Sequence, residues 1–188
     1  MNHTSQMAGE TAADWQQRES DLKASIALKH RLEVVEGEMI KWLCTGLRAV
    51  VKYPGVVDPA KISAIQAQLN KASDYLAIIY IWALLDEHGF GEGSRWVTSD
   101  RQLELAAWKH VRHTGAHAPG QRARHRRQEF EDYMTGQSQA LSGLRQNCTW
   151  SANSIALNSG MSYDFFRFAV NAVNEALSNS ANHPSFTP

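Results

Sequence analysis

An arginine and a histidine separated by four residues mark the most reactive stretch of this chain. Arg112 is followed directly by His113 and, five positions on, by His117, in the sequence R-H-T-G-A-H. Arginine carries a permanent charge on a planar group that matches phosphate oxygens, and histidine exchanges a proton near neutral pH. Such a pair can move the proton of a ribose 2′-hydroxyl and stabilise the charge on a phosphorane. The chemistry that it suits is RNA transesterification without a metal.

The stretch around this pair is basic, although the whole chain is formally neutral. No acidic residue occurs between Lys109 and Arg127. A local excess of cations predicts an anion site. An RNA backbone that passes the pair would meet five further cations, namely Lys109, Arg122, Arg124, Arg126 and Arg127. The alternative is a solvated face whose charges pair with Glu129, Glu131 and Asp132.

The arginine–histidine spacing is weak evidence by itself. In a chain with this many arginines and histidines, roughly one or two such pairs are expected by chance. The context carries the argument: a polar residue directly after the arginine, a helix end at Gly115 and a basic helix that follows. As an alternative, Arg112 could simply cap a helix C-terminus, where cations are favoured.

A histidine triplet offers a second kind of chemistry. On a continuous helix, His110, His113 and His117 would share one face, which suits zinc. A helix break at Gly115 and the lack of Cys, Asp or Glu within the segment argue against a metal site, so we assign no metal and no cofactor.

Apolar residues recur every three to four positions over most of the chain, which predicts amphipathic helices. Five helices are expected. The first runs from about Asp14 to Pro54, with a possible joint near Gly37, and the second from Pro59 to about Glu87. The third runs from about Asp100 into the R-H-T-G-A-H segment, the fourth from 121 to 134 and the fifth from Ser162 to 177. The apolar positions of the last four are Leu69, Ala72, Leu76, Ile79 and Ala83; Leu103, Ala107 and Val111; Phe130 and Met134; and Phe166, Val170, Val173 and Leu177.

Turn-forming and capping residues set the ends of these helices. Asp58 can accept from free amides at a helix start, and Pro59 lacks the N–H that would go unpaired there. We expect Gly115, with the Ala118-Pro119-Gly120 turn, to end the third helix, and Ser162 to cap the last. Residues 136–160 predict a loop, with room for one short helix or strand.

These elements predict an all-α fold, an up-and-down bundle of about five helices. We expect one domain over 12–180, between a flexible N-terminal segment, 1–11, and a tail, 181–188. Cys44 and Cys148 are too few for a disulfide framework, the N-terminus does not resemble a secretory signal, and the longest apolar run, Tyr75–Leu85, is too short to span a bilayer. The expectation is therefore a cytoplasmic protein that does not enter a membrane.

The six residues Arg112–His117 resemble the R-x4–6-H motif of the HEPN superfamily of small α-helical proteins. In that family a polar residue commonly follows the arginine, as His113 does here. The resemblance implies a metal-independent endoribonuclease that cleaves single-stranded RNA, such as a toxin or an anti-phage effector. It implies catalytic roles for Arg112 and His117, a supporting role for His113, and a homodimer in which two such pairs face one groove. One branch carries a tyrosine two positions after the histidine; Pro119 stands there in this chain.

Two other classes of function fit the same residues. The first is a non-catalytic helical binding module, such as an inactive HEPN relative or a subunit of a toxin–antitoxin or defence complex, with an antitoxin or another protein as its partner. The second is a structural bundle whose basic stretch binds an acidic protein. RNA cleavage, RNA binding without cleavage, and protein binding alone distinguish the three classes.

Overall fold

Helices dominate the part of the chain that the structure describes. The structure is a computed structural model, and it describes residues 9–37, 40, 58–91, 97, 99–116, 127–136, 143–151, 154–157 and 160–181. The elements are α1 (Ala12–His30), a π-helical turn η1 (Arg31–Val35), α3 (Pro59–Glu87), α4 (Ser99–Ala116), α5 (Arg127–Thr135), α6 (Gly143–Asn147), β1 (Cys148–Ser151), β2 (Ser154–Leu157) and α7 (Met161–Ala181). The predicted all-α bundle is confirmed. Within these residues, no helix has the length and apolar content needed to cross a membrane.

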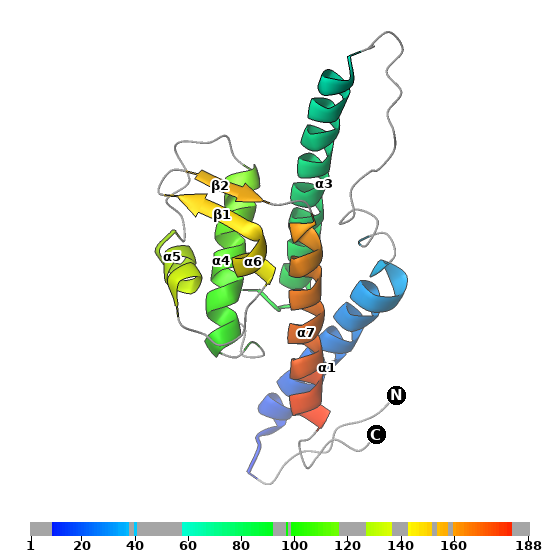
Figure 1. The fold of residues 1–188 in the computed structure, drawn as a ribbon. Coiled ribbons are helices and arrows are strands. Elements are labelled where there is room, and N and C mark those ends of the chain that lie inside the picture. Colours follow the sequence, from blue (N-terminus) through cyan, green and yellow to red (C-terminus); the bar gives the residue numbers. More distant parts are fainter. Residues whose placement is uncertain are drawn as a thin grey trace.

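The long helices form the body of the bundle. Helix α7 packs against α1 on one side and α3 on the other, and α4 packs between α3 and α5 (Figure 1). The strands β1 and β2 form a small antiparallel hairpin next to α4 and α5. The N-terminal part of α3 extends beyond the other helices (Figure 1).

Three aromatic side chains join three helices at the centre of the core. Phe165 of α7 stacks on Trp82 of α3, with ring centroids 5.7 Å apart and planes 14° apart. Its ring also lies 4.9 Å from the ring of Trp108 of α4. All three side chains are at most 1% exposed. Aromatic pairs of this kind add about 0.5–1.5 kcal/mol each beyond the free energy of burying their area, so this cluster fixes the relative positions of α3, α4 and α7.

Local sequence signals set both ends of α3 as predicted. Asp58 accepts a hydrogen bond from the Ala60 amide at 2.9 Å, and Pro59 occupies the first helical position. After Glu87 the chain turns at Gly89, whose φ of +73° lies in the left-handed region that favours glycine. The helix therefore has a defined start and end that come from its own sequence.

The start of α7 differs from the prediction. Helix α7 begins at Met161, so Ser162 lies inside its first turn and does not cap it. The buried carboxylate of Asp74 from α3 accepts hydrogen bonds from groups at the start of α7. The donors are the Ser162 hydroxyl at 2.5 Å and the Gly160 amide at 3.3 Å. Desolvation by burial raises the pKa of Asp74 despite these hydrogen bonds. A long-range contact thus replaces the local cap, which a sequence pattern does not reveal.

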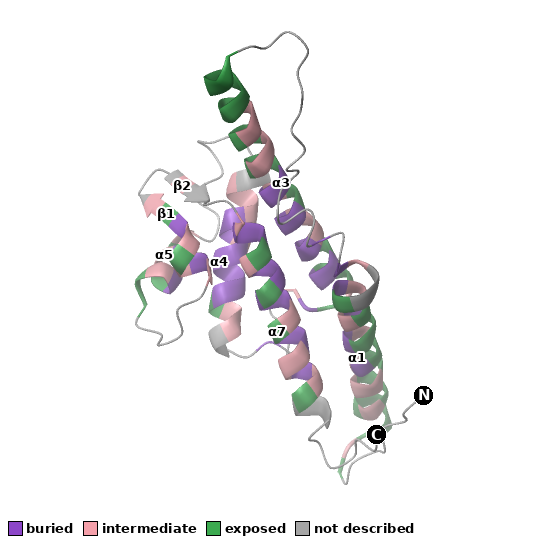
Figure 2. Ribbon diagram, turned by 45° about the vertical axis from the view of Figure 1, so that its right-hand side comes forward, coloured by how far each residue is buried: buried purple, intermediate pink, exposed green. Residues whose placement is uncertain are grey.

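Two predictions about buried faces were wrong. Leu103 of α4 is 38% exposed, and Glu104 is buried in its place, while Ala107 and Val111 are buried as predicted. On α3, the predicted stripe that contains Leu76 does not face the bundle, because Leu76 is 61% exposed. The core face of α3 consists of Ala77, Ile78, Ile81, Trp82, Leu84 and Leu85 (Figure 2). The last two predicted faces were right: Phe130, Phe166 and Val173 are buried, and Met134, Val170 and Leu177 pack against the core.

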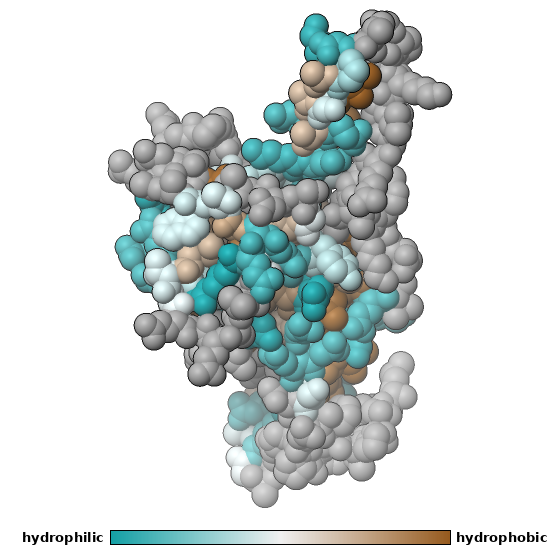
Figure 3. All heavy atoms as spheres, viewed as in Figure 1, coloured by the Kyte–Doolittle hydropathy of each residue, from teal (hydrophilic) through white to brown (hydrophobic). Residues whose placement is uncertain are grey.

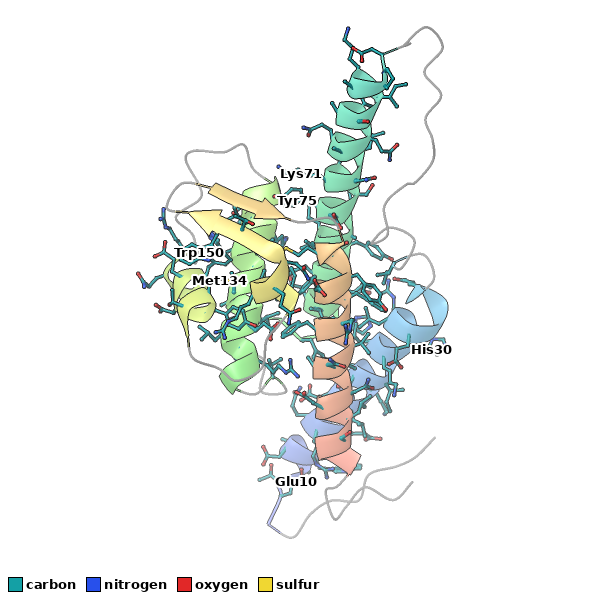
Figure 4. All side chains as sticks on the ribbon, in the orientation of Figure 1. Glu10, His30, Lys71, Tyr75, Met134 and Trp150 are labelled. Carbon is teal, nitrogen blue, oxygen red and sulfur yellow. The ribbon has the colours of Figure 1, made fainter. Side chains whose placement is uncertain are left out.

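The region predicted as a loop contains more regular structure than expected. Helix α6 and the β1–β2 hairpin occupy 143–151 and 154–157, with Cys148 paired to Leu157 and Trp150 to Ile155 in the register. Trp150 points from β1 toward the region of Met134 (Figure 4) and meets the Phe130 ring edge to face at 5.7 Å. The hairpin therefore covers the outer side of the α4–α5 pair.

The aromatic cluster generates a stability prediction. Phe165→Ala should lower the free energy of unfolding by about 3–5 kcal/mol, because it removes a large buried ring and leaves a cavity between three helices. Tyr163→Ala is the matched control on the same helix, since Tyr163 is 41% exposed, and should cost about 1 kcal/mol or less. Urea unfolding followed by circular dichroism measures both. Equal losses for the two variants would contradict the central role of Phe165.

Candidate functional site

Helix α4 presents the motif, and it continues further than predicted. The described helix extends through Gly115 to Ala116, one residue past the predicted break at Gly115, and the Ala118-Pro119-Gly120 turn lies outside the described residues. Arg112, His113 and the backbone up to Ala116 therefore belong to one rigid helix, and His117 lies outside the described residues.

Arg112 leaves α4 on the side of α3. Its guanidinium lies over the ring of Trp82, 5.7 Å from the centroid, and its Nη1 is 3.9 Å from Oδ2 of Asp86. The Arg112 side chain is 31% exposed, and that of Asp86 is 51% exposed. Arg112 thus presents its charge to solvent from a position that an aromatic face and a carboxylate restrain.

The sequence did not predict that Arg112 contacts Trp82 and Asp86. Trp82 and Asp86 are four residues apart on α3, so they share one face of that helix, and this spacing is the only local signal for them. Gly91 allows the chain after α3 to pass close to Asp86, since a Cβ at Gly91 would lie 2.6 Å from Asp86 Oδ1. The end of α3 therefore holds the carboxylate beside Arg112.

The neighbouring histidines lie in different surroundings. His110 is 3% exposed, and its ring lies 5.0 Å from that of Phe130 on α5. His113 is half-buried. Within the described residues, no group of three His, Cys, Asp or Glu side chains is placed to hold a metal ion. His110 is thus a core residue of the α4–α5 contact.

The structure describes two of the five predicted phosphate-binding residues. Lys109 is half-buried on α4, and Arg127, the first residue of α5, donates to Glu131 at 2.7 Å. This ion pair is the one that the solvated-face alternative predicts for Arg127. Arg122, Arg124 and Arg126 lie outside the described residues. The structure therefore brings Arg112 and Lys109 onto one helix.

A buried carboxylate elsewhere on α4 does not belong to this site. Desolvation raises the pKa of Glu104, while the nearby charge of Arg101 and a hydrogen bond that the carboxylate accepts from Tyr133 oppose the rise. Arg101 itself bonds Glu175 of α7 at 2.6 Å. Glu104 precedes Arg112 by eight residues, which is roughly 12 Å along a helix. This network joins α4 to α7 and lies away from the motif.

The comparisons with known proteins add no relative. The chain matches no family model, no curated protein and no solved structure. Its site must therefore be judged on its own chemistry: the permanent cation of Arg112, held half-exposed near the end of the described part of α4, one helical turn after Lys109.

Because Arg112 makes only partly exposed contacts, we expect its replacement to have a small effect on stability. Arg112→Ala should lower the free energy of unfolding by about 1 kcal/mol, the scale of a partly exposed ion pair and a cation–π contact. Trp82→Ala should cost about 3–5 kcal/mol, because Trp82 is buried in the core. Thermal and urea unfolding of both variants test this. A loss for Arg112→Ala as large as that for Trp82→Ala would mean that Arg112 is mainly structural.

Proposed function

We propose that the protein is a HEPN-like, metal-independent endoribonuclease that cleaves single-stranded RNA and acts as a homodimer. The observation that carries the proposal is the position of Arg112, a half-exposed guanidinium restrained by Trp82 and Asp86 near the end of α4. The six-residue motif and the all-α bundle support it further. A toxin or anti-phage effector is the biological role that such an activity suits.

Chain connectivity supports the pairing of Arg112 with His117. Ala116 lies four residues after Arg112 on the same helix, where residues are neighbours about 5–6 Å apart. His117 is bonded to Ala116, and consecutive Cα atoms are about 3.8 Å apart. His117 itself lies outside the described residues, so its pairing with Arg112 is proposed from their separation of five positions in the sequence.

The proposed reaction is an internal transesterification. His117 takes the proton of a ribose 2′-hydroxyl, the 2′-oxygen attacks the adjacent phosphorus, and the bond from phosphorus to the 5′-oxygen breaks. Arg112 stabilises the added negative charge on the phosphorane. The leaving 5′-oxygen takes up a proton from water, and His117 gives its proton back to solvent, so the products end in a 2′,3′-cyclic phosphate and a 5′-hydroxyl. His113, next to Arg112, would orient the substrate.

The second candidate is a non-catalytic binding module. The ion pair between Arg127 and Glu131 and the carboxylate of Asp86 beside Arg112 favour it, because each neutralises part of the positive charge that catalysis would need at the phosphate. RNA binding without cleavage, or binding of a protein such as an antitoxin, is the outcome that this alternative predicts.

Cleavage in the presence of EDTA tests the proposed activity. The wild-type protein should cut single-stranded RNA, and Arg112→Ala and His117→Ala should each slow cleavage by about 100-fold or more, as expected when a catalytic proton transfer or charge contact is lost. His30→Ala is the matched control, because His30 is exposed on α1, and should cut normally. Equal rates for wild type and His117→Ala would rule out the proposed mechanism.

The salt dependence of RNA binding tests the phosphate contacts. Lys109→Ala should weaken binding similarly for different RNA sequences, and should reduce the slope of log K against log salt by about 0.7, the loss of one phosphate contact on a single strand. Lys23→Ala, which changes an exposed lysine of α1, should leave the slope unchanged. Filter binding over a range of salt concentrations measures both slopes. Identical slopes for all three proteins would remove Lys109 from the interface.

A further inference from the structure

Helix α3 carries a second apolar stripe, distinct from its core face. Its members follow one another at alternating steps of three and four residues, and they are Ile62, Ile65, Leu69, Ala72, Leu76, Ile79 and Ala83. This is the heptad spacing of helices that pair along a seam. The stripe covers three heptads, or about 32 Å of helix.

The stripe is accessible although it is apolar. Leu76 is 61% exposed and Ile62 is 36% exposed; Ala72 and Ala83 are also exposed, and the remaining members are half-buried. Part of it lies on the N-terminal end of α3 that extends beyond the other helices, where brown apolar spheres are visible (Figure 3). A contiguous exposed apolar surface of this kind is typical of an interface.

Pairing along this stripe does not require α3 to form anew. The C-terminal half of α3 is already held by the bundle through Ile78, Ile81 and Trp82. The large cost of starting a helix, which makes short isolated coiled coils marginal, is therefore already met by folding. A second helix needs only to cover the outer face.

The sizes of the side chains along the stripe favour an antiparallel pair of α3 helices over a parallel pair. In a parallel pair each residue faces itself, so Ala72 and Ala83 would form two layers with small side chains on both sides. Along the stripe, a and d positions of the heptad alternate, and in an antiparallel pair each a position faces a d position of the other helix. Ala72 then meets Leu69 or Leu76 of the second copy, depending on the register. Large residues then fill the space beside small ones, as dense packing requires.

Charge favours the same orientation. The N-terminal half of α3 carries Lys61 and Lys71, the latter labelled on the extended part of the helix in Figure 4, and its C-terminal end carries Asp86 and Glu87. An antiparallel pair brings the basic half of each helix toward the acidic end of the other. A parallel pair would set like charges together, including Asp86 against Asp86, and such contacts are unfavourable.

We propose that two copies of the chain dimerise through this α3 stripe, antiparallel and centred between residues 70 and 74. The projecting end of each α3 then covers Leu76 and Ile79 of the other copy. The surface is isologous, as expected for a two-fold dimer.

The proposed dimer goes beyond the proposed ribonuclease activity and does not rest on it. In this arrangement the two Asp86 residues, each beside its own Arg112, lie roughly 40 Å apart along the helix pair. Each copy would then carry a separate site. This dimer therefore takes the place of the arrangement that the resemblance implies, in which two Arg112–His117 pairs face one groove.

The mass in solution tests the surface. Sedimentation equilibrium of the full chain should give twice the 21.0 kDa of one copy. Leu76→Glu should shift the mass to that of one copy, because a charge enters the centre of the seam. Ile26→Glu is the matched control: Ile26 is 51% exposed on α1, outside the stripe, and this variant should remain dimeric with an unchanged circular dichroism spectrum. A monomeric wild type, or a Leu76→Glu variant that stays dimeric, would overturn the proposal.

The orientation is tested by a distance between spin labels. Lys61→Cys in a Cys44→Ser background offers one exposed thiol, since burial raises the pKa of Cys148 to about 11 and keeps it protonated. In the antiparallel dimer the labels should be about 30–40 Å apart, from a rise of 1.5 Å per residue on both helices. A distance below about 20 Å would indicate a parallel pair and contradict the proposed orientation. RNA cleavage, measured separately, decides the activity whatever these two experiments give.

Discussion

The contact of Phe165 with Trp82 and Trp108 is the interaction on which the rest of the described structure depends. It joins α7 to both α3 and α4 in a single buried cluster. Arg112 follows Trp108 by one helical turn, and its guanidinium lies over the outer part of the same Trp82. The core contact and the candidate site therefore share a residue, so that the packing of three helices determines where the site presents its positive charge.

The sequence predicts those features whose cause is local. Asp58-Pro59 starts a helix and Gly89 follows its end because capping and backbone conformation depend on neighbouring residues. The core face of α3 could not be predicted in this way, because apolar residues occupy two of its sides and only packing decides which side is buried. Glu104 is likewise buried through its contacts with Arg101 and Tyr133, which come from the fold.

The candidate site likewise combines a feature that the sequence predicts with contacts that only the fold creates. Arg112 and its motif are visible in the sequence, whereas Trp82 and Asp86 become partners of Arg112 only when α3 crosses α4. In the proposed ribonuclease the acidic neighbours matter, since Asp86 beside Arg112 and Glu131 beside Arg127 would each compete with a phosphate for a cation. An RNA that binds here must displace or share those carboxylates, and binding should therefore be sensitive to salt.

The central claim is that the ribose 2′-hydroxyl attacks the phosphate held by Arg112. The most direct measurement compares a short RNA that the protein cleaves at a defined linkage with the same RNA carrying a 2′-O-methyl group on the nucleotide before that linkage. The account predicts cleavage of the first RNA, with a 2′,3′-cyclic phosphate product, and no cleavage of that linkage in the second. Equal cleavage of that linkage in both RNAs would contradict it.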